Sequence, residues 1–142
     1  MQPNQELIGE VRRWLTIVVK DLRRARKDLD VPPVDPDAAL FHCQQAVEKA
    51  MKAFLVWHEQ PFKKTHDLTA LGEQCVSLDA TLDPLVERAA SLSDYGVEFR
   101  YPTDLAEPSV EQAQEAIALA SEFVTAITDR LPEEARVKPE SP

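Results

Sequence analysis

The sequence contains few of the residues that support a disulfide-rich, metal-binding or membrane-spanning protein. Its 142 residues include two cysteines and three glycines, and aromatic residues make up 6%. The two thiols, Cys43 and Cys75, cannot form a disulfide framework or a CxxC metal site, and their apolar neighbours predict small core residues. No run of about eighteen apolar residues is present, so no segment is expected to span a bilayer.

The histidines and the first residues lead to three further expectations. None of the three histidines lies four residues from another, which is the spacing of zinc-binding helices, so no metal site is expected. The first residues are charged rather than apolar, so we expect no export signal and a cytoplasmic location. The length suits one domain, placed at residues 1–132, and a polar C-terminal tail at 133–142 that is expected to fray.

Charge is distributed unevenly along the chain. The net charge of −9 argues against general nucleic-acid binding. Residues 1–29 nevertheless carry a net charge of +3, whereas residues 67–142 carry −11. The first helix ends with a basic face, which fits either a solvated surface or a patch for RNA or phosphate: Lys20, Arg23, Arg24, Arg26 and Lys27.

Apolar residues recur at steps of three and four over five segments, which predicts helices at about 4–29, 35–59, 66–76, 84–92 and 109–131. Capping residues and prolines mark the helix starts: Asn4, Asp35 before Pro36, Thr65, Asp83 before Pro84, and a capping box of Ser109 with Gln112. The expected inward face of the last helix is Val110, Ala113, Ile117, Ala120, Val124, Ile127 and Leu131. The pattern predicts an all-α, five-helix, up-and-down antiparallel bundle with short connections.

The second helix carries the residues with the most chemistry. Its apolar stripe is Leu40, Cys43, Val47, Ala50, Phe54 and Trp57. Beside the stripe lies a polar band, with Gln44 and Glu48 next to it: His42, Gln45, Lys49 and Lys52. Because a helix has a single circumference, these polar side chains must lie close to the buried seam.

Five pieces of sequence, in this order, resemble the HEPN family. They are Trp14 with Asp21-Leu22, the run FHCQQAVEKAMKAFL at 41–55, His-Asp-Leu at 66–68, Arg-Tyr-Pro at 100–102 and an alanine-rich last helix. The resemblance covers roughly residues 7–131. It implies a five-helix up-and-down bundle that often forms a homodimer, and a nucleotide-binding role. Many members are small prokaryotic proteins encoded beside a minimal nucleotidyltransferase, and other branches are toxin ribonucleases.

The ribonuclease branch is marked by an arginine, four to six further residues and then a histidine. No arginine lies five to seven positions before His42, His58 or His66, and no histidine follows Arg100. The resemblance therefore implies a branch without that nuclease mechanism, and we expect the chain not to be an enzyme by itself.

The polar band and the resemblance together suggest a nucleotide or phosphate site at Gln45, Lys49, Lys52, Asp67 and Arg100, with His42, His66 and Tyr101 as additional candidates. Lysine and arginine neutralise phosphate, and glutamine can bind a base or sugar edge. Each residue also has a structural interpretation. The lysines suit a solvated face, the histidines suit packing or capping, and Asp67 suits a helix start or a pair with Lys49 or Arg100.

Three functional hypotheses follow from these residues and the resemblance. The leading one is a nucleotide-binding or interaction module, with or without Mg²⁺, that partners a minimal nucleotidyltransferase in a toxin–antitoxin-like system. The second is a ribonuclease toxin with a non-standard site, such as Arg100 with His42 or His66. The third is a structural homodimer in which the polar band lies in an interface.

Overall fold

The computed structural model describes residues 4–62, 64–95 and 108–137. Within these ranges the chain forms five α-helices and no strand: α1 (Gln5–Asp30), α2 (Pro36–Trp57), α3 (Leu68–Leu78), α4 (Asp83–Ala89) and α5 (Val110–Thr128). Three short 3-10 helices accompany them: η1 (Ala80–Leu82), η2 (Ala90–Tyr95) and η3 (Glu133–Ala135). The predicted all-α, five-helix fold is confirmed.

Three of the predicted helix starts are correct. The Asn4 side chain accepts hydrogen bonds from two backbone amides of the first turn of α1. The Asp35 side chain accepts from the Ala38 amide, ahead of Pro36. Ser109 and Gln112 form the reciprocal capping box of α5. Each cap satisfies an amide that has no partner within its own helix.

Two predicted helix starts are wrong. Asp67, not Thr65, caps α3, because its side chain accepts from the Thr69 amide at 2.9 Å, while the Thr65 hydroxyl accepts from the Asp67 amide. Asp83 is already the first residue of α4, which begins without a side-chain cap. The preceding η1 turn leads directly into α4 and leaves no free N-terminus for Asp83 to cap.

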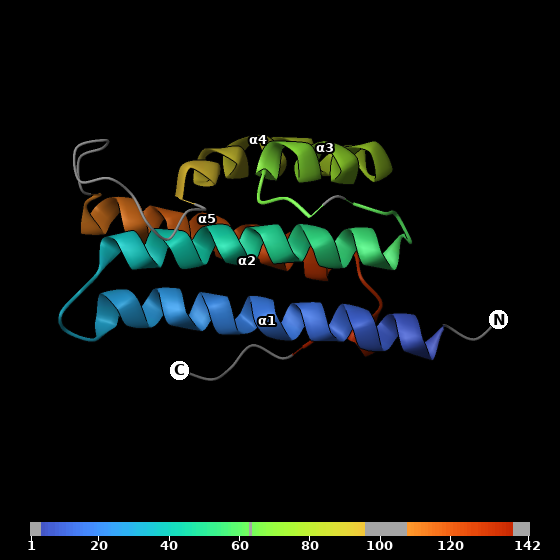
Figure 1. Ribbon diagram of the computed structural model, residues 1–142, viewed down its shortest axis with the longest axis horizontal. Helices are drawn as coiled ribbons and strands as arrows, with labels where there is room; N and C mark the ends of the chain where they lie inside the picture. Colours follow the sequence, from blue (N-terminus) through green and yellow to red (C-terminus); the bar gives the residue numbers. More distant parts are fainter. Residues whose placement is uncertain (1–3, 63, 96–107, 138–142) are drawn as a thin grey trace.

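Helix α2 is the centre of the bundle. It contacts α1, α3 and α5, and Figure 1 shows α1 antiparallel below it, α5 behind it, and α3 with α4 in a layer above. The described parts of the 58–67 segment, residues 58–62 and 64–67, return alongside α2 before α3 begins (Figure 1). His66 therefore lies beside Glu48, while Cys75, later in the chain, lies beside Met51. Helix α3 thus runs in the same direction as α2, which differs from the short antiparallel connection that the sequence predicts.

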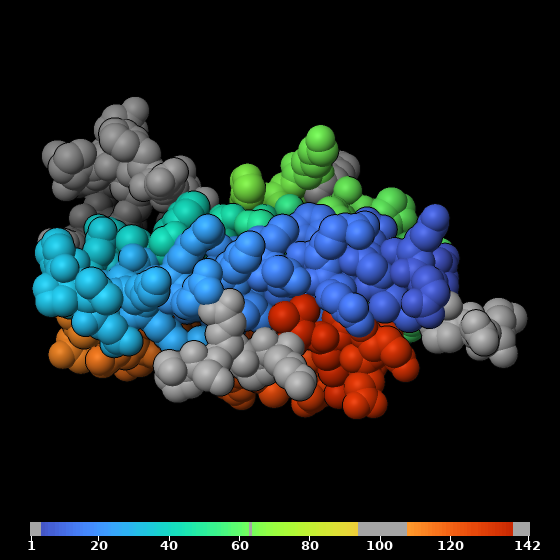
Figure 2. Space-filling model, turned by 90° about the horizontal axis from the view of Figure 1, so that it is seen from below, coloured from blue at the N-terminus to red at the C-terminus, as the bar shows by residue number. Residues whose placement is uncertain are grey.

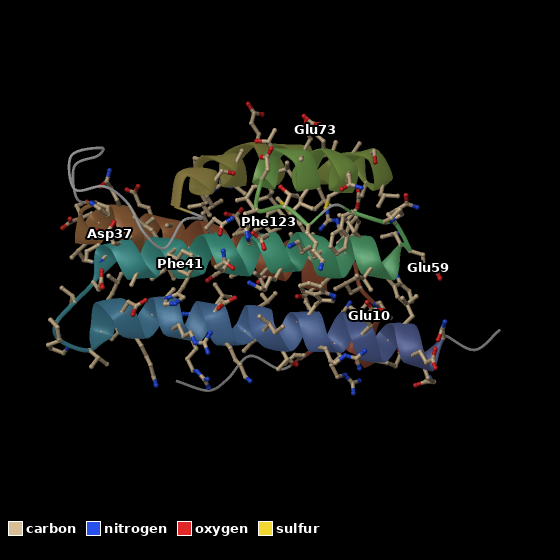
Figure 3. The ribbon with its side chains drawn as sticks, viewed as in Figure 1. Glu10, Asp37, Phe41, Glu59, Glu73 and Phe123 are labelled. Carbon is tan, nitrogen blue, oxygen red and sulfur yellow. The ribbon has the colours of Figure 1, made fainter. Side chains whose placement is uncertain are left out.

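The core is continuous through all five helices. Both cysteines are buried and reduced, as predicted, and burial raises the pKa of each thiol to about 12. On α5 the inward face is rotated from the prediction, because Val110, Ile117 and Val124 are only half-buried. The fully inward residues of α5 are Ala113, Ala116, Ala120, Phe123 and Ile127. Figure 3 shows Phe123 inside the bundle and Glu73 pointing away from it.

The segment after α5 packs against α1 in its described part. Ala135 is completely buried, and the Arg12 side chain donates to the Glu134 carbonyl. Figure 2 shows this C-terminal segment against α1, which runs the length of that face. The expectation of a frayed tail is therefore wrong for residues 133–137. None of the described helices combines the length and the apolar content needed to cross a membrane.

Candidate functional site

Seven polar residues from α1, α2 and the 58–67 segment form one connected cluster, which we call the polar strip: Asp21, Gln44, Gln45, Glu48, Lys49, Lys52 and His66. Five of its side chains come from consecutive turns of α2, and the other two, Asp21 and His66, face them from the neighbouring elements. Asp21, Gln44, Glu48 and Lys52 are buried.

Glu48 is at the centre of the polar strip. One carboxylate oxygen lies 2.7 Å from Nδ1 of His66, and the other lies 3.1 Å from Nζ of Lys52. The Glu48 side chain is 2% exposed and the Lys52 side chain 10%. A buried carboxylate needs this compensation, because leaving an isolated charge in the interior costs several kcal/mol (about 3–5 when one partner is removed).

Lys52 is held by aromatic rings as well as by Glu48. Its ammonium lies 5.9 Å from the Trp14 ring centroid and 5.7 Å from that of Phe62. The two rings contact each other edge to face. These distances suit cation–π attraction, so the Lys52 charge is used mainly inside the protein.

Lys49 occupies the more open side of the strip. Its ammonium donates to Oε1 of Gln45 at 2.7 Å, and it lies 3.8 Å from Oδ2 of Asp21, which is too long for a hydrogen bond. Gln45 in turn donates to Gln44 at 2.6 Å. A chain of hydrogen bonds therefore connects Lys49 to Gln44, which donates to the His66 carbonyl at 3.2 Å.

Asp21 is the polar strip's contribution from α1. Burial raises the pKa of its carboxyl group, while the nearby charges of Lys49, His42 and Arg24 act in the opposite direction. One oxygen has a 3.5 Å contact with Arg24, and the other, Oδ2, has no hydrogen-bond partner among the described residues. This carboxylate has two cations close by, yet it is poorly satisfied.

The structure brings together three of the five main predicted site residues, Gln45, Lys49 and Lys52, and adds His66 from the additional candidates. His42 lies further along α2, where its Nδ1 is 2.7 Å from Asp28. Asp67 is exposed and caps α3 instead of pairing with Lys49. Arg100 and Tyr101 lie outside the described residues.

Asp21 and Glu48 were not among the predicted site residues. A signal for Asp21 is present, since it lies between Val18, Leu22 and Ala25 on the buried face of α1. An acidic residue at such a position requires a partner inside the protein. The pairing of Glu48 with Lys52 follows from their i,i+4 spacing, but its contact with His66 could not be inferred from the sequence, because His66 reaches it only through the course of the 58–67 segment.

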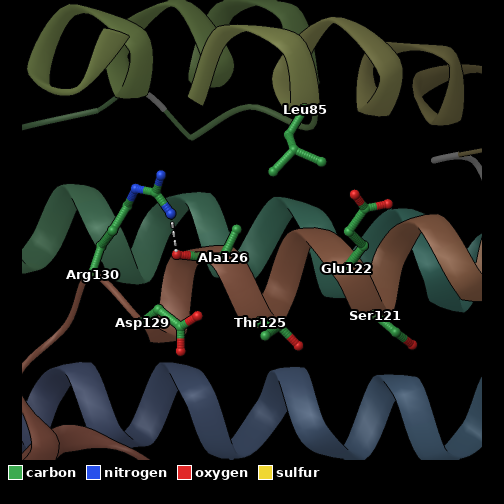
Figure 4. A pocket seen from close by; sticks show the side chains of 7 residues that line it. All are labelled: Leu85, Ser121, Glu122, Thr125, Ala126, Asp129 and Arg130. Carbon is green, nitrogen blue, oxygen red and sulfur yellow. Dashed lines mark hydrogen bonds between the residues drawn. The ribbon is translucent and has the colours of Figure 1, made fainter. Parts of the chain in front are cut away.

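A shallow pocket lies between α4 and α5, away from the polar strip. It has a volume of about 460 Å³, is shown in Figure 4, and is lined by Leu85, Ser121, Glu122, Thr125, Ala126, Asp129 and Arg130. Arg130 donates to Asp79 at 2.8 Å and to the Ala126 carbonyl at 2.7 Å. Glu122 is paired in turn with Arg88, so two of the pocket's charged side chains already have partners outside its lining. None of the predicted site residues that the structure describes lines it.

The part of the chain that the structure describes contains no cluster of three or more histidine, cysteine, aspartate or glutamate side chains suited to a metal ion. In comparisons with known proteins, the model of the family described as HEPN domain matches residues 11–131. No curated protein and no solved structure matches the chain.

Proposed function

The chain belongs to the HEPN domain family, and on this premise we propose that it is a cytoplasmic nucleotide-binding module whose phosphate site is the open side of the polar strip. The family includes nucleotide-binding and ribonuclease-like proteins. The spacing of arginine and histidine that marks the ribonuclease branch is absent from the sequence. A binding role therefore fits this chain better than the standard nuclease mechanism.

The observation that supports this proposal is the incomplete pairing of Lys49. Its ammonium has three donors, one of which is used by Gln45, while the nearest Asp21 oxygen is 3.8 Å away. Arg24 approaches the same carboxylate at 3.5 Å from the exposed face of α1. A phosphate within reach of both cations would receive charge-assisted hydrogen bonds from both.

The other groups have consistent roles in this site. Gln45 supports Lys49 and has an amide that can bind a sugar or base edge. Lys52 contributes positive potential from behind, since its own contacts are internal. Arg100 and Tyr101 remain sequence-based candidates for the same ligand, and Mg²⁺ would accompany a polyphosphate.

Thermal unfolding with a panel of nucleotides, with and without Mg²⁺, tests this proposal. A ligand at a hundred times its dissociation constant stabilises the folded state by about 2.7 kcal/mol. We expect Lys49→Gln to remove that stabilisation and Lys20→Gln, a change at an exposed lysine of α1, to retain it. Stabilisation that is equal in wild type and Lys49→Gln would disprove the assigned site.

We also propose that the chain forms a homodimer and partners a minimal nucleotidyltransferase in a prokaryotic two-component system. This part rests on the family resemblance alone. Light scattering after size exclusion gives the mass of the chain by itself and after mixing with such an enzyme. A monomer that does not change mass on mixing would contradict both statements. If no nucleotide binds but a dimer forms, the structural dimer is the better description.

A ribonuclease with a non-standard site is the second candidate, and the contact of His66 with Glu48 favours it, because a histidine oriented by a carboxylate is a common acid–base arrangement. Incubation of purified protein with RNA tests it. Cleavage that is lost in both His66→Phe and Arg100→Ala would support this candidate. Intact RNA at high protein concentration would remove it.

A further inference from the structure

His66 is anchored at two points and is still open to solvent. Its Nδ1 lies 2.7 Å from a Glu48 oxygen, and its backbone carbonyl accepts from Nε2 of Gln44 at 3.2 Å. The His66 side chain is nevertheless 72% exposed, whereas the Glu48 side chain is 2% exposed. A fully buried carboxylate thus holds the direction of an exposed imidazole ring.

The charges around Glu48 decide which nitrogen of His66 carries the proton. The negative charge of Glu48 is already balanced by Lys52 at 3.1 Å. A carboxylate accepts hydrogen bonds, so the His66 nitrogen that faces it must carry a hydrogen. In the neutral ring the outer nitrogen, Nε2, then has a free lone pair and acts as an acceptor.

We propose that Nε2 of His66 accepts a hydrogen bond from a ribose hydroxyl of the bound nucleotide, and that Glu48 is the positioning residue that makes this possible. This inference rests on the proposed nucleotide site and names its preference for an intact ribose over a sugar that lacks the 2′- or the 3′-hydroxyl. The 2′-hydroxyl is the group that distinguishes ribonucleotides from deoxyribonucleotides.

The layout of the strip favours a sugar over a base as the donor. The hydrogen bonds from Lys49 through Gln45 and Gln44 end at the His66 carbonyl, so the phosphate site and His66 belong to one hydrogen-bonded network. In every nucleotide the sugar follows directly after the phosphate, whereas the donors of the base lie beyond it and differ between bases. A ribose hydroxyl is also a suitable donor to Nε2 of the neutral His66 ring, because that nitrogen carries a lone pair and no positive charge.

Affinities for four triphosphates test the inference: ATP, 2′-deoxy-ATP, 3′-deoxy-ATP and inosine triphosphate, which lacks the amino group of adenine. We expect wild type to bind ATP about tenfold more tightly than at least one deoxy analogue, as for one lost hydrogen bond. Inosine triphosphate should bind like ATP. The ratio of the affinity for ATP to that for the deoxy analogue should fall to about one in His66→Phe and in Glu48→Gln. The ratio should stay near ten in the control His58→Phe, which changes an exposed histidine at the end of α2.

A spectroscopic measurement separates positioning from general damage to the fold. The ¹⁵N shifts of the His66 ring should show the Nδ1–H tautomer in wild type and a mixture with the Nε2–H tautomer in Glu48→Gln. Because Glu48 is buried, circular dichroism and thermal unfolding first establish that Glu48→Gln is folded. His66→Phe supplies the independent variant if it is not.

The outcomes distinguish this inference from the proposal beneath it. Equal binding of ATP and both deoxy analogues, with binding still dependent on Lys49, would overturn the role of His66 and leave the nucleotide site standing. Weaker binding of inosine triphosphate alone would assign the donor to the base and overturn the ribose. If none of the four triphosphates binds to wild type, the nucleotide site and this inference both fail.

Discussion

The polar strip and the α4–α5 surface contain the same kinds of charged side chains in opposite environments. Within the strip, Glu48 and Lys52 form a pair that is almost completely enclosed. Between α4 and α5, Arg88 and Glu122 are 3.1 Å apart, but their side chains are 55% and 53% exposed. The contact distances of the two pairs are the same, so the difference lies in the surrounding solvent.

The two regions also shift aspartate in opposite directions. Burial raises the pKa of Asp21, since too few partners compensate for the lost water. Hydrogen bonds from Thr81 and Arg130 lower the pKa of the half-buried Asp79. The comparison shows that a short ion pair by itself does not indicate a functional site. Incomplete compensation of a buried charge is the more informative feature.

Glu48→Ala should have the largest effect on stability. The substitution removes the carboxylate that compensates Lys52 and leaves this buried ammonium without its acidic partner. We expect a loss of about 3–5 kcal/mol in the free energy of unfolding, measured by urea denaturation. Glu122→Ala is the matched control, and a similar loss there would break the distinction between the two regions.

Gly72→Ala should destabilise the α3–α4 side, where packing rather than charge is decisive. A methyl group at Gly72 would lie 2.4 Å from Cγ1 of Val86. Valine is stiff at its branched carbon and cannot easily move away, so we expect a cost of about 1–3 kcal/mol. In a protein that already carries Val86→Ala, Gly72→Ala should lower the free energy of unfolding much less. A double-mutant cycle measured by urea denaturation would show this difference.

The opposite pKa shifts predict opposite pH dependences for two asparagine variants. The pKa of Asp21 is raised above 3.8 in the folded protein. Asp21 therefore contributes favourably to the free energy of unfolding below pH 3.8, and this contribution is lost as the pH rises through its pKa in the folded protein. Asp21→Asn should therefore gain stability relative to wild type between pH 4 and pH 7. Urea denaturation across this range measures the gain.

Asp79 should behave in the reverse sense. Its pKa is lowered, so its contribution is present above 3.8 and is lost as the pH falls through the folded value. Asp79→Asn should be less stable than wild type at neutral pH, and the gap should close below pH 3.8. Parallel pH curves for the two variants would contradict the opposing environments.

Arg88→Ala should have the smallest effect. An ion pair between exposed side chains contributes about 0–1 kcal/mol, and added salt screens it. We expect the difference from wild type to be within that range at low salt and to disappear at high salt in thermal unfolding. A salt-resistant loss would show that this surface depends on Arg88 in some other way.

The sequence by itself determined the helices and most of their starts. The caps at Asn4, Asp35 and Ser109 depend on hydrogen bonds that reach two or three residues along the chain, so short sequence patterns encode them. The stripe of α2, apart from the half-buried Trp57, and the burial of both cysteines follow from helical periodicity in the same way. The family resemblance also lies in the order of these local pieces.

Only the tertiary structure decided which polar residues meet. His66 is eighteen positions from Glu48, and their contact depends on the return of the 58–67 segment along α2. On α5, several apolar residues compete for the inward face, and packing against α2 selects Phe123 over Ile117. Asp67 became a cap because α3 starts two residues later than the sequence predicts. These outcomes depend on the directions of neighbouring helices, which residues close in sequence do not encode.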